Sequence, residues 1–93
     1  MQIEFSRPAD WQLRSLEDVD REEVNAWCDR LRNWDDDQDV RSRSRLLDVP
    51  GYGEIHFLAT NTDYRLFFIL QGDRIEVIDI AHKDTLQRFA QAV

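Results

Sequence analysis

Four polar side chains in the second half of the sequence are of the types that carry out acid–base chemistry. They are the carboxylate of Glu54, the imidazoles of His56 and His82, and the guanidinium of Arg65. Arg65 interrupts residues 63–70, a run that is otherwise apolar at nearly all positions and is typical of a central strand covered on both faces. Imidazole and carboxylate groups exchange protons in catalysis, and a guanidinium stabilises developing negative charge.

Three predicted strands would bring these four groups together. The hydrophobic runs 53–58, 63–70 and 75–80 indicate an antiparallel meander. Between the last two runs, Gly72 and Asp73 predict a tight two-residue hairpin, because glycine tolerates the positive φ that such a turn requires.

The expected register places the four groups on one face of this meander. A two-residue hairpin and an even-length loop over residues 59–62 set His56 opposite Arg65, with Glu54 and His82 on the same side. That face would also hold Phe67, Ile69, Glu76, Ile78 and Ile80. The other face would be fully apolar, with Ile55, Phe57, Leu66, Phe68, Leu70, Ile75 and Val77. An odd-length loop or a bulge would separate the groups.

Each of these groups also has an ordinary structural interpretation. Arg65 could form an ion pair with Glu54 or Glu76 and only stabilise the sheet. His82 stands next to a predicted helix start, where histidine often caps or packs, and His56 could be a neutral residue on an exposed sheet face.

The first part of the sequence predicts a strand and a short helix. Residues 2–5 alternate polar and apolar side chains, as a short edge or parallel strand does. Pro8 suits the first turn of a helix over residues 9–16, in which Leu13 and Leu16 share one face.

A second helix is predicted to begin at Asp20. Glu23 follows three residues later, as in a capping box, and Val19 and Val24 occupy the positions of a hydrophobic staple. The apolar residues at helical spacing, which are expected to cover the sheet as core, are Val24, Trp27, Cys28, Leu31 and Trp34.

The net charge of −7 is concentrated in this second helix and its extension. Residues 17–39 hold ten acidic and three basic residues, and the rest of the chain is neutral in sum. The aspartates of residues 35–39 are expected to end the helix in solvent, or to dock a basic peptide. Next come Arg41, Arg43 and Arg45, which in an extended segment would form a comb facing phosphates, or alternatively a solvated linker.

The length and composition predict one domain over residues 1–93 of the α+β class. In this architecture a short N-terminal strand and a two-helix hairpin pack on an antiparallel sheet that ends in the meander, followed by a short helix over residues 83–93. The sequence shows no signal peptide and no membrane-spanning run, so a cytoplasmic protein without a membrane partner is expected. Cys28 is the only cysteine, no His-x-x-x-His motif is present, and no metal or other cofactor is expected.

The order of these elements and several short motifs resemble the RelE/ParE family of bacterial type II toxins. A leucine pair and a glycine turn, Leu46-Leu47 and Pro50-Gly51, precede the second strand of the family pattern. Tyr64-Arg65 then opens the apolar strand, and the last strand ends in Ala81-His82-Lys83. The resemblance runs over most of the chain and is strongest over residues 47–89.

The resemblance implies a toxin held inactive by a cognate antitoxin in a hetero-oligomer. In the ribonuclease branch, such a protein cleaves mRNA within the ribosome. Arg65 matches the family's strand arginine that contacts the scissile phosphate, and Lys83 matches a second basic residue. Glu54 and His56 fall at basic or acid–base positions of the second strand, and Phe89 stands where several members have a catalytic tyrosine.

RNA carries its own nucleophile, the 2′-hydroxyl group, so cleavage without a metal needs a base, an acid and cations. On this hypothesis His56 or Glu54 is the base, His82 protonates the leaving oxygen, and Arg65 and Lys83 stabilise the transition state. Two alternatives remain: a ParE-like inhibitor that binds gyrase, and a non-toxic binding protein with the same fold, which the net charge favours.

Overall fold

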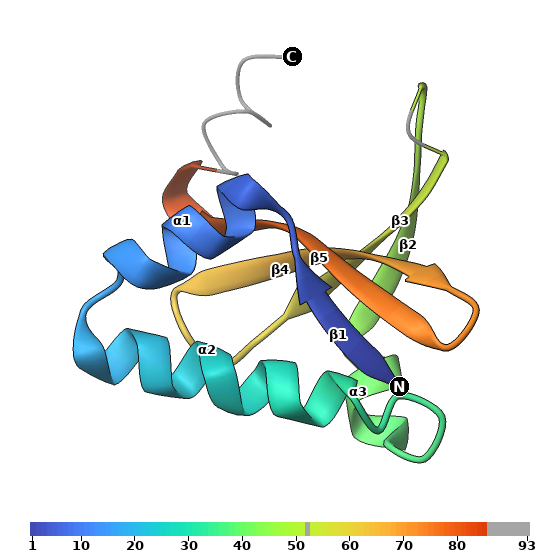
Figure 1. Cartoon of the computed structure of the whole chain (residues 1–93), viewed down its shortest axis with the longest axis horizontal. Helices are drawn as coiled ribbons and strands as arrows, with labels where there is room; N and C mark the ends of the chain where they lie inside the picture. Colours follow the sequence, from blue (N-terminus) through green and yellow to red (C-terminus); the bar gives the residue numbers. More distant parts are fainter. Residues whose placement is uncertain (52, 86–93) are drawn as a thin grey trace.

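The computed structural model describes residues 1–51 and 53–85, and its elements lie around one mixed sheet (Figure 1). In chain order the elements are β1 (Gln2–Phe5), α1 (Arg7–Ser15), α2 (Asp18–Leu31), α3 (Gln38–Ser42), β2 (Ser44–Val49), β3 (Gly53–Ala59), β4 (Tyr64–Gln71) and β5 (Arg74–His82). In this part of the chain the sheet has five strands in the order β1-β5-β4-β3-β2. β1 is parallel to β5, and the other neighbours are antiparallel. The predicted α+β class is confirmed.

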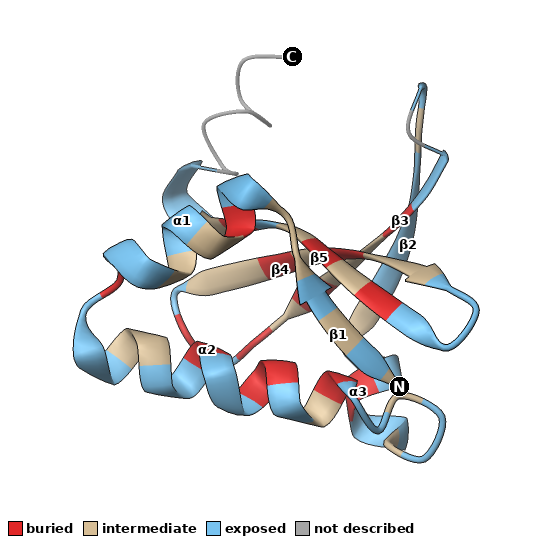
Figure 2. Cartoon of the chain, viewed as in Figure 1, coloured by how far each residue is buried: buried red, intermediate tan, exposed pale blue. Residues whose placement is uncertain are grey.

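The three helices contribute to a single core against one face of the sheet (Figure 2). The helical side contributes Ala9, Leu16, Val24, Trp27, Cys28, Leu31 and Val40, and the sheet contributes Leu58, Leu66, Phe68, Ile75, Val77 and Ile80. These side chains are nearly all inaccessible to solvent, so their burial is the main stabilising term. We call the side of the sheet that this core covers the helix face, and the other side the open face.

The first helix forms, but it spans Arg7–Ser15 and so begins two residues earlier than predicted. Ser6 caps it, because its hydroxyl accepts a hydrogen bond from the backbone N–H of Ala9 at 3.2 Å, and Pro8 lies in the first turn. The same hydroxyl donates to the carbonyl oxygen of Ile78 at 2.7 Å, which ties the start of α1 to β5.

The second helix begins earlier than predicted, and the predicted capping box and staple are wrong. α2 starts at Asp18, and Val19 is 67% exposed. The guanidinium of Arg21 contacts Asp18 and the carbonyl oxygens of Arg14 and Leu16, so it joins the end of α1 to the first turn of α2. The predicted apolar face is confirmed for Val24, Trp27, Cys28 and Leu31, whereas Trp34 lies in a turn after the helix and is partly buried.

A short third helix replaces the predicted extended segment after the acidic run. The carboxylate of Asp37 accepts from the backbone N–H of Val40 at 3.1 Å and also pairs with Arg30 at 2.9 Å. Val40 is fully buried, so α3 is held to the core at its centre. The three arginines around it therefore do not form an extended comb.

β2 extends the predicted three-strand meander by one strand. It pairs with β3 over six residues, and the two form a hairpin that projects from the rest of the molecule (Figure 1). The predicted hairpin between β4 and β5 is confirmed, with Gln71 paired to Arg74 and Gly72 at φ +61°. Residues 83–85 are helical, and the remainder of the predicted terminal helix lies outside the described residues. No described helix has the length and apolar character needed to cross a membrane.

Candidate functional site

The register between β3 and β4 separates His56 from Arg65. Ala59 pairs with Arg65, which leaves residues 60–64 between them, an odd number. Paired residues share a face, so the predicted pairing of His56 with Arg65 is wrong. Side chains on β3 are turned over relative to the expectation: Phe57 shares the open face with Arg65, and His56 lies on the helix face.

Two threonine hydroxyl groups stabilise the β3–β4 loop in this conformation. The Oγ1 atoms of Thr60 and Thr62 are 2.7 Å apart, and both residues are buried. Thr60 Oγ1 donates to the carbonyl oxygen of Tyr64 at 2.6 Å, and Thr62 Oγ1 accepts from the Tyr64 N–H at 3.0 Å. The indole N–H of Trp27 donates to Asn61 at 2.8 Å, which fastens the same loop to α2.

His56 belongs to an aromatic cluster at the edge of the core. Its ring stacks on Phe68, with centroids 5.2 Å apart and an interplanar angle of 14°, and meets the edge of Trp34 at 5.4 Å. Burial lowers the pKa of His56 below its usual value of 6.5, although the nearby charge of Glu54 acts in the opposite direction. The imidazole is therefore a neutral packing group near pH 7.

A bulge in β5 moves His82 to the helix face as well. Phe68 pairs with Val77, but Phe67 pairs with Asp79, so Ile78 is an extra residue. Every side chain after the bulge is turned over, and Ile80 enters the core. His82 therefore pairs with Tyr64, and its predicted position beside Arg65 is wrong.

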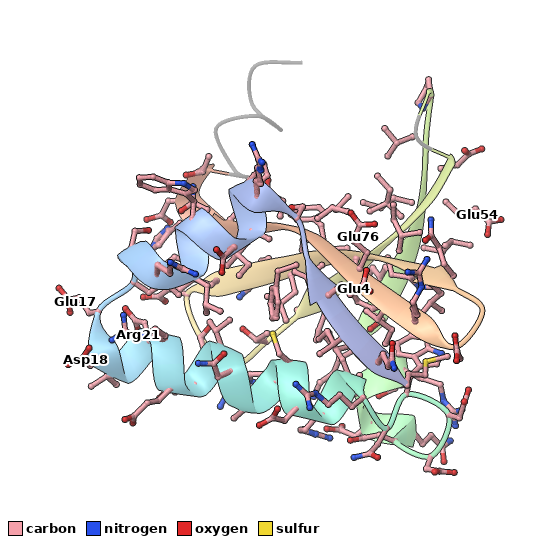
Figure 3. The ribbon with its side chains drawn as sticks, in the orientation of Figure 1. Glu4, Glu17, Asp18, Arg21, Glu54 and Glu76 are labelled. Carbon is pink, nitrogen blue, oxygen red and sulfur yellow. The ribbon has the colours of Figure 1, made fainter. Side chains whose placement is uncertain are left out.

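Glu54 is also apart from Arg65. It pairs with Asp48 on β2 and is exposed. Because Glu54 is two residues from His56 on β3, its side chain lies on the same face as that of His56. Figure 3 shows it on the projecting hairpin, away from Glu4 and Glu76 on β1 and β5.

Arg65 lies on the open face and closes the β3–β4 loop. Its Nη1 atom donates to the carbonyl oxygens of Thr60, Thr62 and Tyr64 at 3.3, 2.7 and 3.0 Å. Arg65 therefore bonds to backbone carbonyl groups, and not to Glu54 or Glu76 as the structural interpretation of the sequence suggested. Because those acceptors are neutral, the guanidinium keeps its positive charge available to a ligand.

Lys83 is the second basic group at this end of the open face. The backbone N–H of Lys83 donates to the carbonyl oxygen of Asp63 at 2.8 Å, and the side-chain ammonium is 3.2 Å from the Asp63 carboxylate. Arg65 pairs with Ala81, and Lys83 directly follows the end of β5. Of the five predicted catalytic residues, Arg65 and Lys83 are the two that bind the β3–β4 loop.

The three arginines predicted to bind RNA point to different surroundings. Arg41 donates to the carbonyl oxygen of Asp35, and Arg43 pairs with Asp39 while its guanidinium lies 5.4 Å from the ring centre of Trp27. Arg45 alone belongs to the sheet, where it is exposed and pairs with Phe57.

The open face carries an apolar surface that the sequence reasoning missed. We call it the open-face cluster, and its members are Leu47, Ile55, Phe57, Phe67 and Ile69. Ile55 is buried, at 6% exposure, but does not belong to the core cluster under the helices. The rings of Phe57 and Phe67 meet edge to face at 5.2 Å. The period-two pattern was visible in the sequence, but the wrong register assigned Ile55 and Phe57 to the core.

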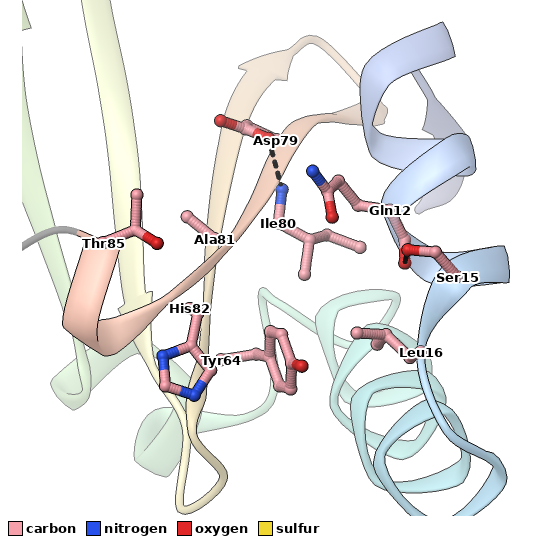
Figure 4. Close-up of a pocket in the computed structure, with 9 residues that line it drawn as sticks. All are labelled: Gln12, Ser15, Leu16, Tyr64, Asp79, Ile80, Ala81, His82 and Thr85. Carbon is pink, nitrogen blue, oxygen red and sulfur yellow. Dashed lines mark hydrogen bonds between the residues drawn. The ribbon is translucent and has the colours of Figure 1, made fainter.

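A polar hollow of about 300 Å³ lies between α1 and the ends of β4 and β5 (Figure 4). Gln12, Ser15, Tyr64, His82 and other residues line it, and the rings of Tyr64 and His82 are perpendicular at 5.3 Å. Burial, together with the charges of Asp20, Asp63 and Glu17, raises the pKa of Tyr64. His82 Nδ1 accepts from the Asp84 N–H, so this imidazole is oriented by the start of the next helical turn.

Within residues 1–51 and 53–85, no three His, Cys, Asp or Glu side chains are grouped so that they could hold a metal ion. The lone thiol, Cys28, is buried, and burial raises its pKa to about 12. It is therefore not a nucleophile at neutral pH.

Comparison with solved structures identifies the architecture. The isolated E. coli RelE toxin matches with a TM-score of 0.66 at 14% identity, over 95% of this chain and 97% of that chain. The chain has the RelE fold. A RelB–RelE antitoxin–toxin complex from Methanococcus jannaschii matches the RelE fold of this chain with a TM-score of 0.64 at 14% identity, covering 92% of this chain and 96% of that one.

The intact E. coli RelBE toxin–antitoxin complex also contains a chain similar to this RelE fold, with a TM-score of 0.56 at 15% identity over 87% of this chain and 94% of that one. No protein-family model matches the sequence, and no curated protein does. The likeness therefore lies in the RelE fold and not in sequence identity.

Proposed function

We propose that this protein is the toxin component of a bacterial type II toxin–antitoxin pair, active in the cytoplasm. The observation that carries the proposal is that Arg65 and Lys83 both bind the β3–β4 loop of a RelE fold. Two of the similar structures are complexes of a toxin with its antitoxin, which supports a cognate antitoxin as the partner in a hetero-oligomer.

The activity that we propose is metal-independent cleavage of mRNA at the ribosome. Arg65 and Lys83 would bind the scissile phosphate and stabilise its extra charge in the transition state. The 2′-hydroxyl oxygen of the RNA would attack the phosphorus and displace the 5′ oxygen, and solvent water would take the proton of the hydroxyl and supply one to the leaving oxygen. Glu54, His56 and His82 receive no acid–base role, since all three lie on the helix face. Without a positioned base and acid, each worth about 10²–10⁴-fold, the reaction would be slow.

Induced expression with transcript mapping tests this activity. We expect growth arrest and new 5′ ends in translated mRNA, and we expect Arg65→Ala and Lys83→Ala to abolish both. Arg14→Ala is the matched control, because it removes an exposed arginine from α1 and leaves the open face unchanged. Cleavage by the Arg65→Ala protein at the parental rate would contradict the proposal.

A second candidate is a protein that acts by binding alone. It is favoured by the position of both imidazoles on the helix face and by the apolar character of the open face. A ParE-like protein would inhibit supercoiling by purified gyrase and leave mRNA intact. A non-toxic binding protein of this fold would affect neither growth, translation nor supercoiling.

A further inference from the structure

The sheet ends at β2 in an open main-chain edge. In the described part of the chain, β2 has a strand neighbour on its β3 side alone, and the hairpin of the two strands projects from the rest of the molecule (Figure 1). Proteins commonly protect such an edge with lysine, proline or a bulge, because it can pair with another strand. β2 contains none of these, and Leu46 at its centre is 53% exposed.

Every second residue of β2 directs its main-chain groups to this edge. The N–H of Ala59 donates to the carbonyl oxygen of Arg43 at 3.3 Å, so these two residues form a hydrogen-bonded pair at the start of the β2–β3 ladder. Hydrogen-bonded and non-hydrogen-bonded pairs alternate along an antiparallel ladder. The N–H and C=O groups of Ser44, Leu46 and Asp48 therefore point away from β3. Among the described residues, these groups have no main-chain partner.

The three outward residues are symmetric about Leu46. If two copies of β2 lie antiparallel about a two-fold axis perpendicular to the sheet, Leu46 can face Leu46 of the other copy, and Ser44 can face Asp48. This register joins all three outward residues in hydrogen-bonded pairs, with about six main-chain bonds. A shift of two residues in either direction sets an outward residue opposite α3 or opposite Pro50, which has no N–H.

The two ends of β2 also differ in charge. Arg41, which bonds to the neutral carbonyl group of Asp35, precedes the strand, and the exposed Arg45 lies near its start. At the other end, Asp48 is directly opposite Glu54 of β3, and both are exposed. Like charges in directly opposite positions destabilise a sheet. Antiparallel pairing places the basic start of one β2 beside the acidic end of the other, which offsets this repulsion at both ends.

We propose that two copies of this chain associate through their β2 strands in this register. The contact is isologous, and it joins two five-stranded sheets into one. Because the axis is perpendicular to the sheet, the open faces of the two copies lie on the same side, with Arg45 of each copy opposite Leu47 of the other. One strand pair buries little area, so we expect a weak and reversible dimer.

The self-complementarity of β2 favours a second copy over an unrelated strand. Strand addition takes its affinity from main-chain hydrogen bonds, which any extended segment can supply. A second β2 supplies them without overhang at either end, and it brings the opposite charge to each end. The proposal does not depend on the proposed function.

Sedimentation velocity at increasing protein concentration measures the association, and we expect a monomer–dimer equilibrium for the parent. Amide hydrogen exchange at low and high concentration locates the contact. The N–H groups of Leu46 and Asp48 should be protected only at high concentration. Those of Arg45 and Leu47, which bond to β3, should be protected at both.

Leu46→Pro tests the main-chain contact. It removes an N–H that β3 does not use, so the β2–β3 ladder should persist, as the protection of Arg45 and Leu47 will show. The dimer loses one hydrogen bond from each copy, and we expect association to weaken by about tenfold or more. Leu46→Thr is the matched control, since it changes the side chain but keeps the N–H, and it should weaken association less.

Cysteine substitutions test the register. Leu46→Cys places two thiols on the two-fold axis with Cα atoms about 5.5 Å apart, within disulfide range. In Leu47→Cys the two thiols would be diagonal to each other, and Val19→Cys, on the exposed side of α2, reports random collisions. Cys28 is buried and does not contribute. We expect Leu46→Cys to oxidise to a covalent dimer about tenfold faster than either control, because the contact holds its thiols together.

Three results would overturn the proposal. They are a parent that stays monomeric at every concentration, association of Leu46→Pro as strong as that of the parent, and oxidation of Leu46→Cys no faster than that of Val19→Cys. Dimers formed only by a chain ending at Thr85 would assign the edge to the chain's own last residues. Equal binding of a peptide of residues 43–49 and a peptide with the same residues in scrambled order would assign it to extended segments in general. None of these measurements depends on toxicity, so this proposal and the proposed function can fail separately.

Discussion

His56 stacks on Phe68 on one face of the sheet, while Arg65 of the neighbouring strand emerges from the other face. One extra residue in the β3–β4 loop produces this separation. The imidazole is thereby assigned to packing and the guanidinium to the surface. This arrangement has consequences for stability as well as for chemistry.

Stability should fall at mildly acidic pH because of His56. Its pKa is lowered in the folded protein, so below about pH 6.5 the unfolded chain binds more protons than the folded one. The free energy of unfolding should therefore decrease as the pH falls through 6.5 towards the folded pKa. We expect urea denaturation at about pH 7.5 and pH 5.5 to show a larger decrease for the parent than for His56→Gln. A His82→Gln variant serves as the control, and equal decreases in all three proteins would contradict the prediction.

Arg65 should contribute to stability independently of any activity. Arg65→Ala removes the donor that serves three carbonyl groups, and we expect it to lower the free energy of unfolding by about 1–3 kcal/mol. Hydrogen exchange should accelerate in the β3–β4 loop, including Asn61 and Thr62. Arg65→Lys, which keeps the charge, should restore phosphate binding more than it restores loop protection. If both variants keep the exchange rates of the parent, the guanidinium does not hold the loop.

The face to which Ile80 points should be essential for the core. Inserting one alanine between Asp79 and Ile80 would turn Ile80 out of the core and move His82 to the open face, because side chains alternate along a strand. We expect a loss of about 2–5 kcal/mol in the free energy of unfolding, as for other emptied core positions. Ile78→Ala keeps the bulge and should cost much less, since Ile78 is only partly buried. Thermal denaturation of the two variants measures the difference, and an insertion as mild as the substitution would contradict the prediction.

Cys28 should be unreactive in the native protein. With a pKa of about 12, only about 10⁻⁴ of this thiol is ionised at pH 8, and it is 3% exposed. We expect modification by a disulfide reagent to follow global unfolding, with rapid labelling in concentrated urea. Fast labelling in buffer would indicate that α2 opens locally.

The sequence by itself determined the elements and much of the core. The spacing of Val24, Trp27, Cys28 and Leu31 specifies one buried helix face, and that face is observed. Gly72 and Asp73 specify the last hairpin, because the turn requires a residue with positive φ. The alternation in residues 2–5 also identified the first strand, since each of these signals is local.

Only the tertiary structure decided which side chains share a face. A strand has a side-chain period of two, so one residue in the β3–β4 loop and one in the β5 bulge each turn over a whole strand segment. Neither the loop nor the bulge is marked by a distinctive residue type in the sequence. The loop is stabilised by hydrogen bonds of Thr60, Thr62 and Arg65, and the bulge by the packing of Ile80 in the core. As a result, Glu54, His56 and His82 lie on the face opposite Arg65, and Phe57 lies on the same face as Arg65. The local sequence of one strand does not determine these positions, because register depends on contacts between strands.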